Sequence, residues 1–152
     1  MIDAKCSTKT KASKIKVVEK GKQAVFLNPN KSEFVKVQMD GCVRVNETSC
    51  DWLIIHQKVD VILIELKGTD VDHALFQIEA TFQYLKENGL LGARNAALIV
   101  CSRPSRHPSF TSKLQKTKSR LSDLYRAPLH VVTGSHEYHV DKVLSHSGPL
   151  GG

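Results

Sequence analysis

The segment Val61-Ile62-Leu63-Ile64-Glu65-Leu66-Lys67 places an acid and a base two positions apart at the end of an apolar run. Successive side chains of a β-strand point to opposite faces, so Glu65 and Lys67 would share one face and Leu66 would point to the other. A charged pair in an otherwise apolar strand is costly to bury unless the protein uses it. Glu65 and Lys67 are therefore our first candidates for catalytic residues.

A third candidate follows from the register of a predicted hairpin. Residues 51–57 and 60–67 are both rich in branched apolar residues and are separated by a short connection, which predicts two antiparallel strands. Facing residue numbers in such a hairpin have a constant sum, here about 116 to 118, which sets Asp51 opposite Glu65 or Lys67. Two carboxylates and one ammonium group would thus meet at one end of the hairpin.

This set of groups suits metal-assisted hydrolysis of a phosphodiester. Two close carboxylates repel each other unless a cation lies between them, and Mg²⁺ or Mn²⁺ prefers oxygen ligands. We expect a metal site formed by Asp51, Glu65 and the backbone carbonyl of Leu66. Lys67 would orient or help deprotonate the attacking water, or neutralise charge on the phosphate.

At these residues the sequence resembles the PD-(D/E)xK nuclease superfamily. The match is Asp51 followed by Glu65-Leu66-Lys67 at the end of the next strand. The resemblance implies a restriction-endonuclease-like fold over roughly residues 33–132. It also implies that Asp51 and Glu65 are metal ligands and that Lys67 is the catalytic lysine.

Three further positions are interpreted through the same resemblance. Some members carry a glutamine on the following helix that supports the site, and Gln77 matches that placement. Cys50 stands where the name of the motif has proline. The family often adds a glutamate from an N-terminal helix. No strong helix precedes Glu33 here, so the site would lack this acid unless Glu33 or Glu47 supplies it.

The elements that must position these residues predict an α/β fold with one central mixed β-sheet flanked by helices. Gly68 ends the second strand of the hairpin, and an apolar stripe of period 3 to 4 predicts a helix from Val71 to Glu87. A strand at 96–102 after this helix would pair in parallel with 60–67. We expect a flexible basic arm at 1–13, a nuclease-like domain at 14–146 and a disordered tail at 147–152. The remaining expected elements are strands at 15–18, 24–27, 34–37 and 129–132, a helix at 109–125 and a short element at 138–144.

Charge and composition indicate the partner. The chain has 152 residues and a formal net charge of +7, which suits a polyanion such as nucleic acid. DNA is the favoured substrate, and the resemblance makes a homodimer or a partner subunit a reasonable analogy. A solvated helix face is the alternative for the candidate phosphate-binding stripe around the second helix, which consists of Arg103, Arg106, Lys113, Lys116 and Arg120.

No apolar run is long enough to cross a membrane and no secretory signal is evident, so we expect a cytoplasmic protein with no membrane partner. The four cysteines are then expected to be reduced thiols. Three other functional classes stay open beside a DNA nuclease. The first is a catalytically inactive nuclease fold that binds nucleic acid or a protein, and the second is an RNA-cleaving member. The third is an immunity-type or toxin-neutralising partner.

Overall fold

The computed structural model describes residues 2–103, 107–134 and 136–146. No described helix has the length and apolar character needed to cross a membrane. Arg106 and the predicted tail at 147–152 lie outside the described residues. The helices are a short 3₁₀ helix η1 (Ala4–Cys6), α1 (Val71–Glu87), α2 (Pro108–Tyr125) and α3 (Val140–Val143). The strands are β1 (Ser7–Thr10), β2 (Lys14–Glu19), β3 (Lys22–Leu27), β4 (Phe34–Gln38), β5 (Trp52–His56), β6 (Asp60–Lys67), β7 (Arg94–Cys101), β8 (Leu129–Thr133) and β9 (Glu137–Tyr138).

The central sheet is mixed, as predicted, and has six strands in the order β1-β4-β5-β6-β7-β8. Strands β5 and β6 form the predicted antiparallel hairpin, and Trp52 pairs with Ile64, so the preceding residue, Asp51, faces Glu65. Helix α1 then crosses over to β7, which runs parallel to β6. The fold is therefore α/β, with the hairpin, the crossover helix and the parallel strand in the predicted places.

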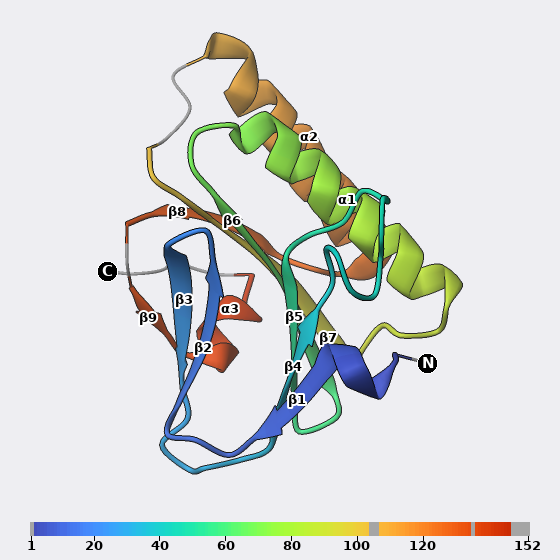
Figure 1. Cartoon of the computed structure of the whole chain (residues 1–152). Coiled ribbons are helices and arrows are strands. Elements are labelled where there is room, and N and C mark those ends of the chain that lie inside the picture. The colour runs from blue at the N-terminus through green and yellow to red at the C-terminus, as the bar shows by residue number, and fades with distance from the viewer. Residues whose placement is uncertain (1, 104–106, 135, 147–152) are drawn as a thin grey trace.

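Two apolar layers sandwich the central sheet. Because side chains alternate along β6, Leu63 joins the layer under α1 and α2, whereas Ile62 and Ile64 join the opposite layer. The opposite layer is closed by α3 and by a second sheet of order β2-β3-β9 (Figure 1). The sequence predicted one sheet only, because β9 has two residues and pairs with β3, which lies far from it in the chain.

The expectation of a flexible N-terminal arm is wrong for residues 7–10. These residues form β1, which pairs with β4 at the edge of the central sheet. The expectation of reduced thiols is wrong for Cys6, which forms a disulfide with Cys42, whereas Cys50 and Cys101 are free and buried. An edge strand with both faces near solvent needs no apolar alternation, so the polar residues of β1 did not indicate a strand.

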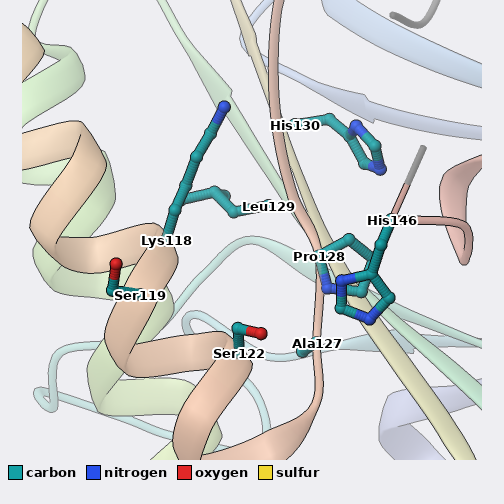
Figure 2. Close-up of a pocket in the computed structure, with 8 residues that line it drawn as sticks. All are labelled: Lys118, Ser119, Ser122, Ala127, Pro128, Leu129, His130 and His146. Carbon is teal, nitrogen blue, oxygen red and sulfur yellow. The ribbon is translucent and has the colours of Figure 1, made fainter. Parts of the chain in front are cut away.

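Strand β8 forms the other edge of the central sheet. A pocket of about 300 Å³ lies beside this edge, where α2 passes the start of β8 and where His146 returns after α3 (Figure 2). The pocket is two strands away from β6 and is separate from the predicted catalytic residues.

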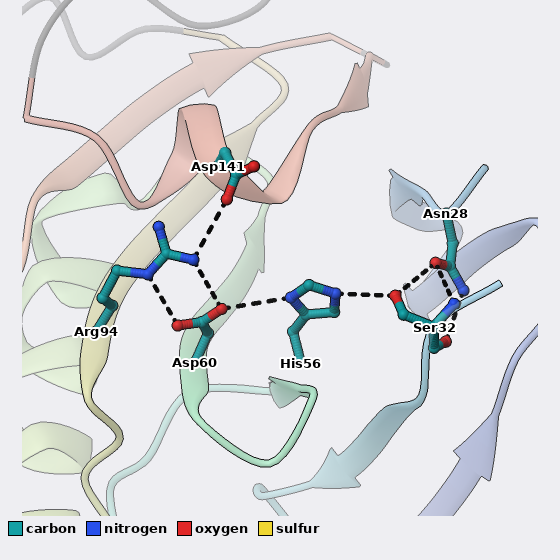
Figure 3. Close-up of polar contacts among 6 residues, drawn as sticks. All are labelled: Asn28, Ser32, His56, Asp60, Arg94 and Asp141. Carbon is teal, nitrogen blue, oxygen red and sulfur yellow. Dashed lines mark hydrogen bonds and ion pairs between the residues drawn. The ribbon is translucent and has the colours of Figure 1, made fainter. Parts of the chain in front are cut away.

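A polar network holds the turn end of the β5–β6 hairpin (Figure 3). Asp60 is buried and accepts two hydrogen bonds from Arg94, both at 2.9 Å. His56 lies between Asp60 and Ser32, at 3.3 Å and 2.9 Å, and so connects the hairpin to the loop before β4. The turn end is thus fixed to β7 on one side and to that loop on the other.

Candidate active site

The end of the β5–β6 hairpin opposite its turn brings Asp51 and Glu65 together. The backbone N–H of Asp51 donates to Glu65 Oε1 at 3.0 Å, and the backbone N–H of Leu66 donates to Asp51 Oδ2 at 2.9 Å. Both acids are buried, with 6% and 1% of their surface exposed. Each carboxylate therefore receives one backbone donor from the neighbouring strand, and this exchange fixes the two groups beside each other.

Lys67 completes the predicted trio. Its ammonium nitrogen lies 3.3 Å from Glu65 Oε2, and 24% of its side chain is exposed. The side chain of Leu66 is buried in the opposite apolar layer, as the strand alternation predicted. The centre is therefore closed to solvent at the carboxylates and open at the lysine.

Burial disfavours two negative charges at this centre. Burial, and then the charge of Asp51, raise the pKa of Glu65 from 4.5 to about 8, against the opposing effect of Lys67. Burial also raises the pKa of Asp51, and the charge of Glu19 adds to this effect, while the Leu66 N–H and Lys67 oppose it. A hydrogen bond between the two carboxyl groups favours the proton on Glu65. These shifts favour a proton at the centre when no cation is bound.

The donor set suits a hard divalent ion. Mg²⁺ keeps several waters and is commonly held by only one or two carboxylates, which is what Asp51 and Glu65 offer. Among the described residues, no three His, Cys, Asp or Glu side chains are grouped closely enough to hold a metal without other ligands. Water and a backbone oxygen such as that of Leu66 would have to complete the coordination.

Helix α1 supports the segment that leads to Asp51. Gln77 is buried, and its Nε2 donates to the carbonyl oxygen of Ser49 at 3.2 Å. Thr81 Oγ1 accepts a hydrogen bond from the Cys50 N–H at 2.8 Å. Gln77 thus contacts the chain two residues before Asp51 rather than the carboxylates, and Thr81, which the sequence analysis did not single out, has an equivalent role.

Neither Glu33 nor Glu47, the acids considered for an additional role, is grouped with Asp51 and Glu65 in the described parts of the chain. The backbone carbonyl of Glu33 accepts from the Gln57 N–H, which places Glu33 at the turn end of the hairpin. Glu47 is exposed and pairs with Arg44 at 3.3 Å.

Glu19 instead comes close enough to influence Asp51 electrostatically. It ends β2, and the preceding residue, Val18, accepts a hydrogen bond from Trp52 Nε1 at 3.1 Å, next to Asp51 in the chain. Sequence reasoning missed Glu19 because only the docking of the second sheet on the first brings it there.

The turn of the β2–β3 hairpin also reaches the end of β6. Lys20 and Gly21 both have positive φ, as a type I′ turn requires. A Cβ at Gly68 would lie 3.8 Å from Nζ of Lys22, so this ammonium passes close to the residue after Lys67. A cavity of about 130 Å³ at the same place is lined by Lys22 and Ser102 among other residues.

The predicted basic stripe on α2 is partly neutralised. Lys113 pairs with Asp72 at 3.2 Å and Arg120 pairs with Glu79 at 2.7 Å, so both cations are committed to helix α1. The other described members of the stripe, Arg103 and Lys116, are exposed.

Comparisons of the chain with protein-family models, with curated proteins and with solved structures find no match. Function is therefore inferred from the arrangement of the site residues.

Proposed function

We propose that this protein is a Mg²⁺- or Mn²⁺-dependent nuclease of the PD-(D/E)xK type that hydrolyses phosphodiester bonds, with DNA as the favoured substrate. The convergence of Asp51, Glu65 and Lys67 at one end of a buried hairpin is the observation that carries this proposal. The order of hairpin, helix and parallel strand supports it, because the same order is implied by the resemblance of the sequence to that superfamily.

The three side chains have separate tasks in this proposal. Asp51 and Glu65 would bind the cation, which supplies a Lewis acid for the phosphoryl oxygens when it is bound. Lys67 is positioned between Glu65 and solvent, so its ammonium can orient the attacking water or neutralise charge on the incoming phosphate. Gln77 and Thr81 act at a distance, because they hold the segment before Asp51.

The β2–β3 hairpin supports a nucleic acid as substrate. Alternate residues of β2 face solvent, and Lys16 is exposed on that outer face, as is Lys20 at the turn. Lys36 of β4 lies beside β2, where its Nζ donates to the Lys16 carbonyl oxygen at 3.0 Å. Lys22 passes beside Gly68, the residue after Lys67, so a phosphate backbone bound along the hairpin would reach the end of β6.

The test is cleavage of supercoiled plasmid, branched DNA and RNA with Mg²⁺, Mn²⁺ or EDTA. Glu65→Gln and Lys67→Ala should lose metal-dependent cutting, whereas Glu47→Gln, which changes an exposed acid outside the centre, should retain it. Cutting of DNA alone would support the favoured substrate, and cutting of RNA alone would identify an RNA-cleaving member. Cutting that survives both site substitutions would overturn the assignment of the centre.

A second candidate function is a nuclease fold that binds nucleic acid or a protein without cleaving it. The observation in its favour is that the pKa of Glu65 is raised to about 8, so the centre can hold a proton instead of a metal at neutral pH. Tight DNA or RNA binding that is indifferent to Mg²⁺, with no cutting of any substrate, would favour this candidate.

A further inference from the structure

The pocket beside β8 is lined by a cluster of nitrogen and hydroxyl groups that the nuclease centre does not use (Figure 2). Helix α2 contributes one ammonium and two hydroxyl groups, and two imidazoles come from β8 and from the segment after α3. These side chains belong to Lys118, Ser119, Ser122, His130 and His146.

The hydrogen bonds of the two imidazoles determine which nitrogen is left for a ligand. His130 Nε2 lies 2.8 Å from the carbonyl oxygen of Val143, and His146 Nε2 lies 3.1 Å from that of Arg126. A carbonyl oxygen only accepts, so each Nε2 carries the hydrogen. Nδ1 of each ring is then the atom that gains a proton when the imidazole becomes charged.

The charge of the pocket is one-sided. Neither Asp nor Glu is among the described residues that line it. Lys113 and Arg120 on the same helix form ion pairs with carboxylates. Within the described parts of the chain, no such ion pair is found for Lys118. Burial, and then the positive charges of Lys118 and His146, lower the pKa of His130, against hydrogen bonds to the backbone of Val143 and Ser145 that raise it. The cluster therefore repels further positive charge and would be stabilised by an anion.

We propose that this pocket binds a phosphate group. The Lys118 ammonium would provide a permanent charge, Ser119 and Ser122 would donate from their hydroxyl groups, and the imidazoles would become donors when protonated at Nδ1. A metal ion is disfavoured at the same two imidazoles because the ammonium of Lys118 lies beside them. The proposal does not depend on nuclease activity, since none of these side chains belongs to the centre at Asp51 and Glu65.

Phosphate binding would be coupled to proton uptake. The charged groups that face His130 are Lys118 from α2 and His146 from the C-terminal segment, and both oppose its protonation. A bound phosphate opposes them in turn, so it should raise the pKa of His130. By linkage, phosphate binding should be accompanied by proton uptake at His130, in a pH range where inorganic phosphate itself also gains a proton.

The experiment is a titration of the full chain with inorganic phosphate, with the imidazole signals of His130 and His146 followed by NMR. We expect saturable shifts of the signals of both rings and a raised pKa for His130. Lys118→Gln should weaken binding at least about tenfold, the effect expected for one charge-assisted hydrogen bond. Lys58→Gln removes the same charge from an exposed position outside the pocket and should leave the affinity unchanged. Equal weakening by both substitutions, or signals of His130 and His146 that phosphate does not move, would overturn the proposal.

Two further arms identify the source of the phosphate. A short oligonucleotide with a 5′-terminal phosphate that shifts both rings, while the unphosphorylated oligonucleotide does not, would assign the pocket to the end of a nucleic acid strand. Shifts with inorganic phosphate alone would assign it to a small phosphate. The Glu65→Gln variant should bind phosphate here as the wild type does, so failure of the nuclease proposal and failure of this one are distinguishable.

Discussion

Glu65 and Asp51 are joined through a main-chain group: the N–H of Asp51 donates to Glu65 Oε1 at 3.0 Å. In return, the side chain of Asp51 accepts a hydrogen bond from the N–H of Leu66 at 2.9 Å. The main-chain pairing of β5 with β6 ends at Trp52 and Ile64, and these two hydrogen bonds link the strands beyond that pair. The two acids are therefore positioned by main-chain N–H groups of the paired strands, which donate to carboxylates here instead of to main-chain carbonyl oxygens.

The first prediction concerns metal binding and pH. Because burial and the charge of Asp51 raise the pKa of Glu65 to about 8, a cation must displace a proton at lower pH. Apparent Mg²⁺ or Mn²⁺ affinity should fall by about tenfold per pH unit below about 8 and level off above it. Calorimetry at several pH values checks this. Affinity that does not change between pH about 6 and about 8 would show that Glu65 is not the group that loses the proton.

A second prediction follows for stability in EDTA. The pKa of Glu65 is higher in the folded than in the unfolded chain, so the folded state binds more protons between the two values. The contribution of this carboxyl to the free energy of unfolding is fully present below the unfolded pKa of about 4.5 and is lost as the pH rises through about 8. Urea unfolding of the wild type and Glu65→Gln should show this pH-dependent decrease in the wild type and a weaker one in the variant.

Thr81 should matter for the position of Asp51. Thr81→Val removes the acceptor of the buried Cys50 N–H and should lower the free energy of unfolding by about 1–3 kcal/mol. Cleavage should fall as well, because the segment before Asp51 loses one of its supports. Thr81→Ser keeps the hydroxyl and is the matched control. Equal thermal stability of the Val and Ser variants would contradict this role.

The disulfide between Cys6 and Cys42 should stabilise the N-terminal strand. It closes a segment with a sequence separation of 36 residues, so its removal should cost about 3–4 kcal/mol. Denaturation of Cys42→Ser, compared with wild type before and after a reductant, measures this. The reductant should lower the stability of the wild type and leave the variant unchanged.

The hairpin lysines should carry more of the nucleic acid affinity than the lysines of α2. On duplex DNA, replacement of Lys20 and Lys22 by Gln should reduce the slope of log affinity against log salt by about 0.9 for each phosphate that the protein no longer neutralises. Lys113→Gln should change the slope little, because Lys113 already pairs with Asp72. Fluorescence anisotropy with labelled duplex in EDTA measures binding without cleavage. A larger change of the slope with Lys113→Gln than with the replacement of Lys20 and Lys22 would show that α2, and not the hairpin, binds the nucleic acid.

Much of the centre could be predicted because its information is local. The apolar strands and short turn around residues 51–67 fix the register, and the register brings Asp51 to Glu65. The helix over Val71–Glu87 was predicted with its bounds, since its apolar stripe is visible in the sequence.

Features that depend on the packing of distant segments could not be predicted in this way. Strand β1 is polar because it is an edge strand, and Cys6 finds Cys42 only after β1 pairs with β4. Glu19 reaches the centre only through the packing of the second sheet, and the charges of Lys113 and Arg120 are neutralised only when α2 lies against α1.

The two ends of the β5–β6 hairpin are held in different ways, and this gives the hairpin a gradient of local stability. At the turn end, Asp60 receives two hydrogen bonds from Arg94 and a contact from His56. At the other end, two acids whose burial opposes their charge take the place of ladder hydrogen bonds. Fraying is therefore expected to start at Asp51 and not at the turn, and amide hydrogen exchange should be faster at the end that holds Asp51 and Glu65.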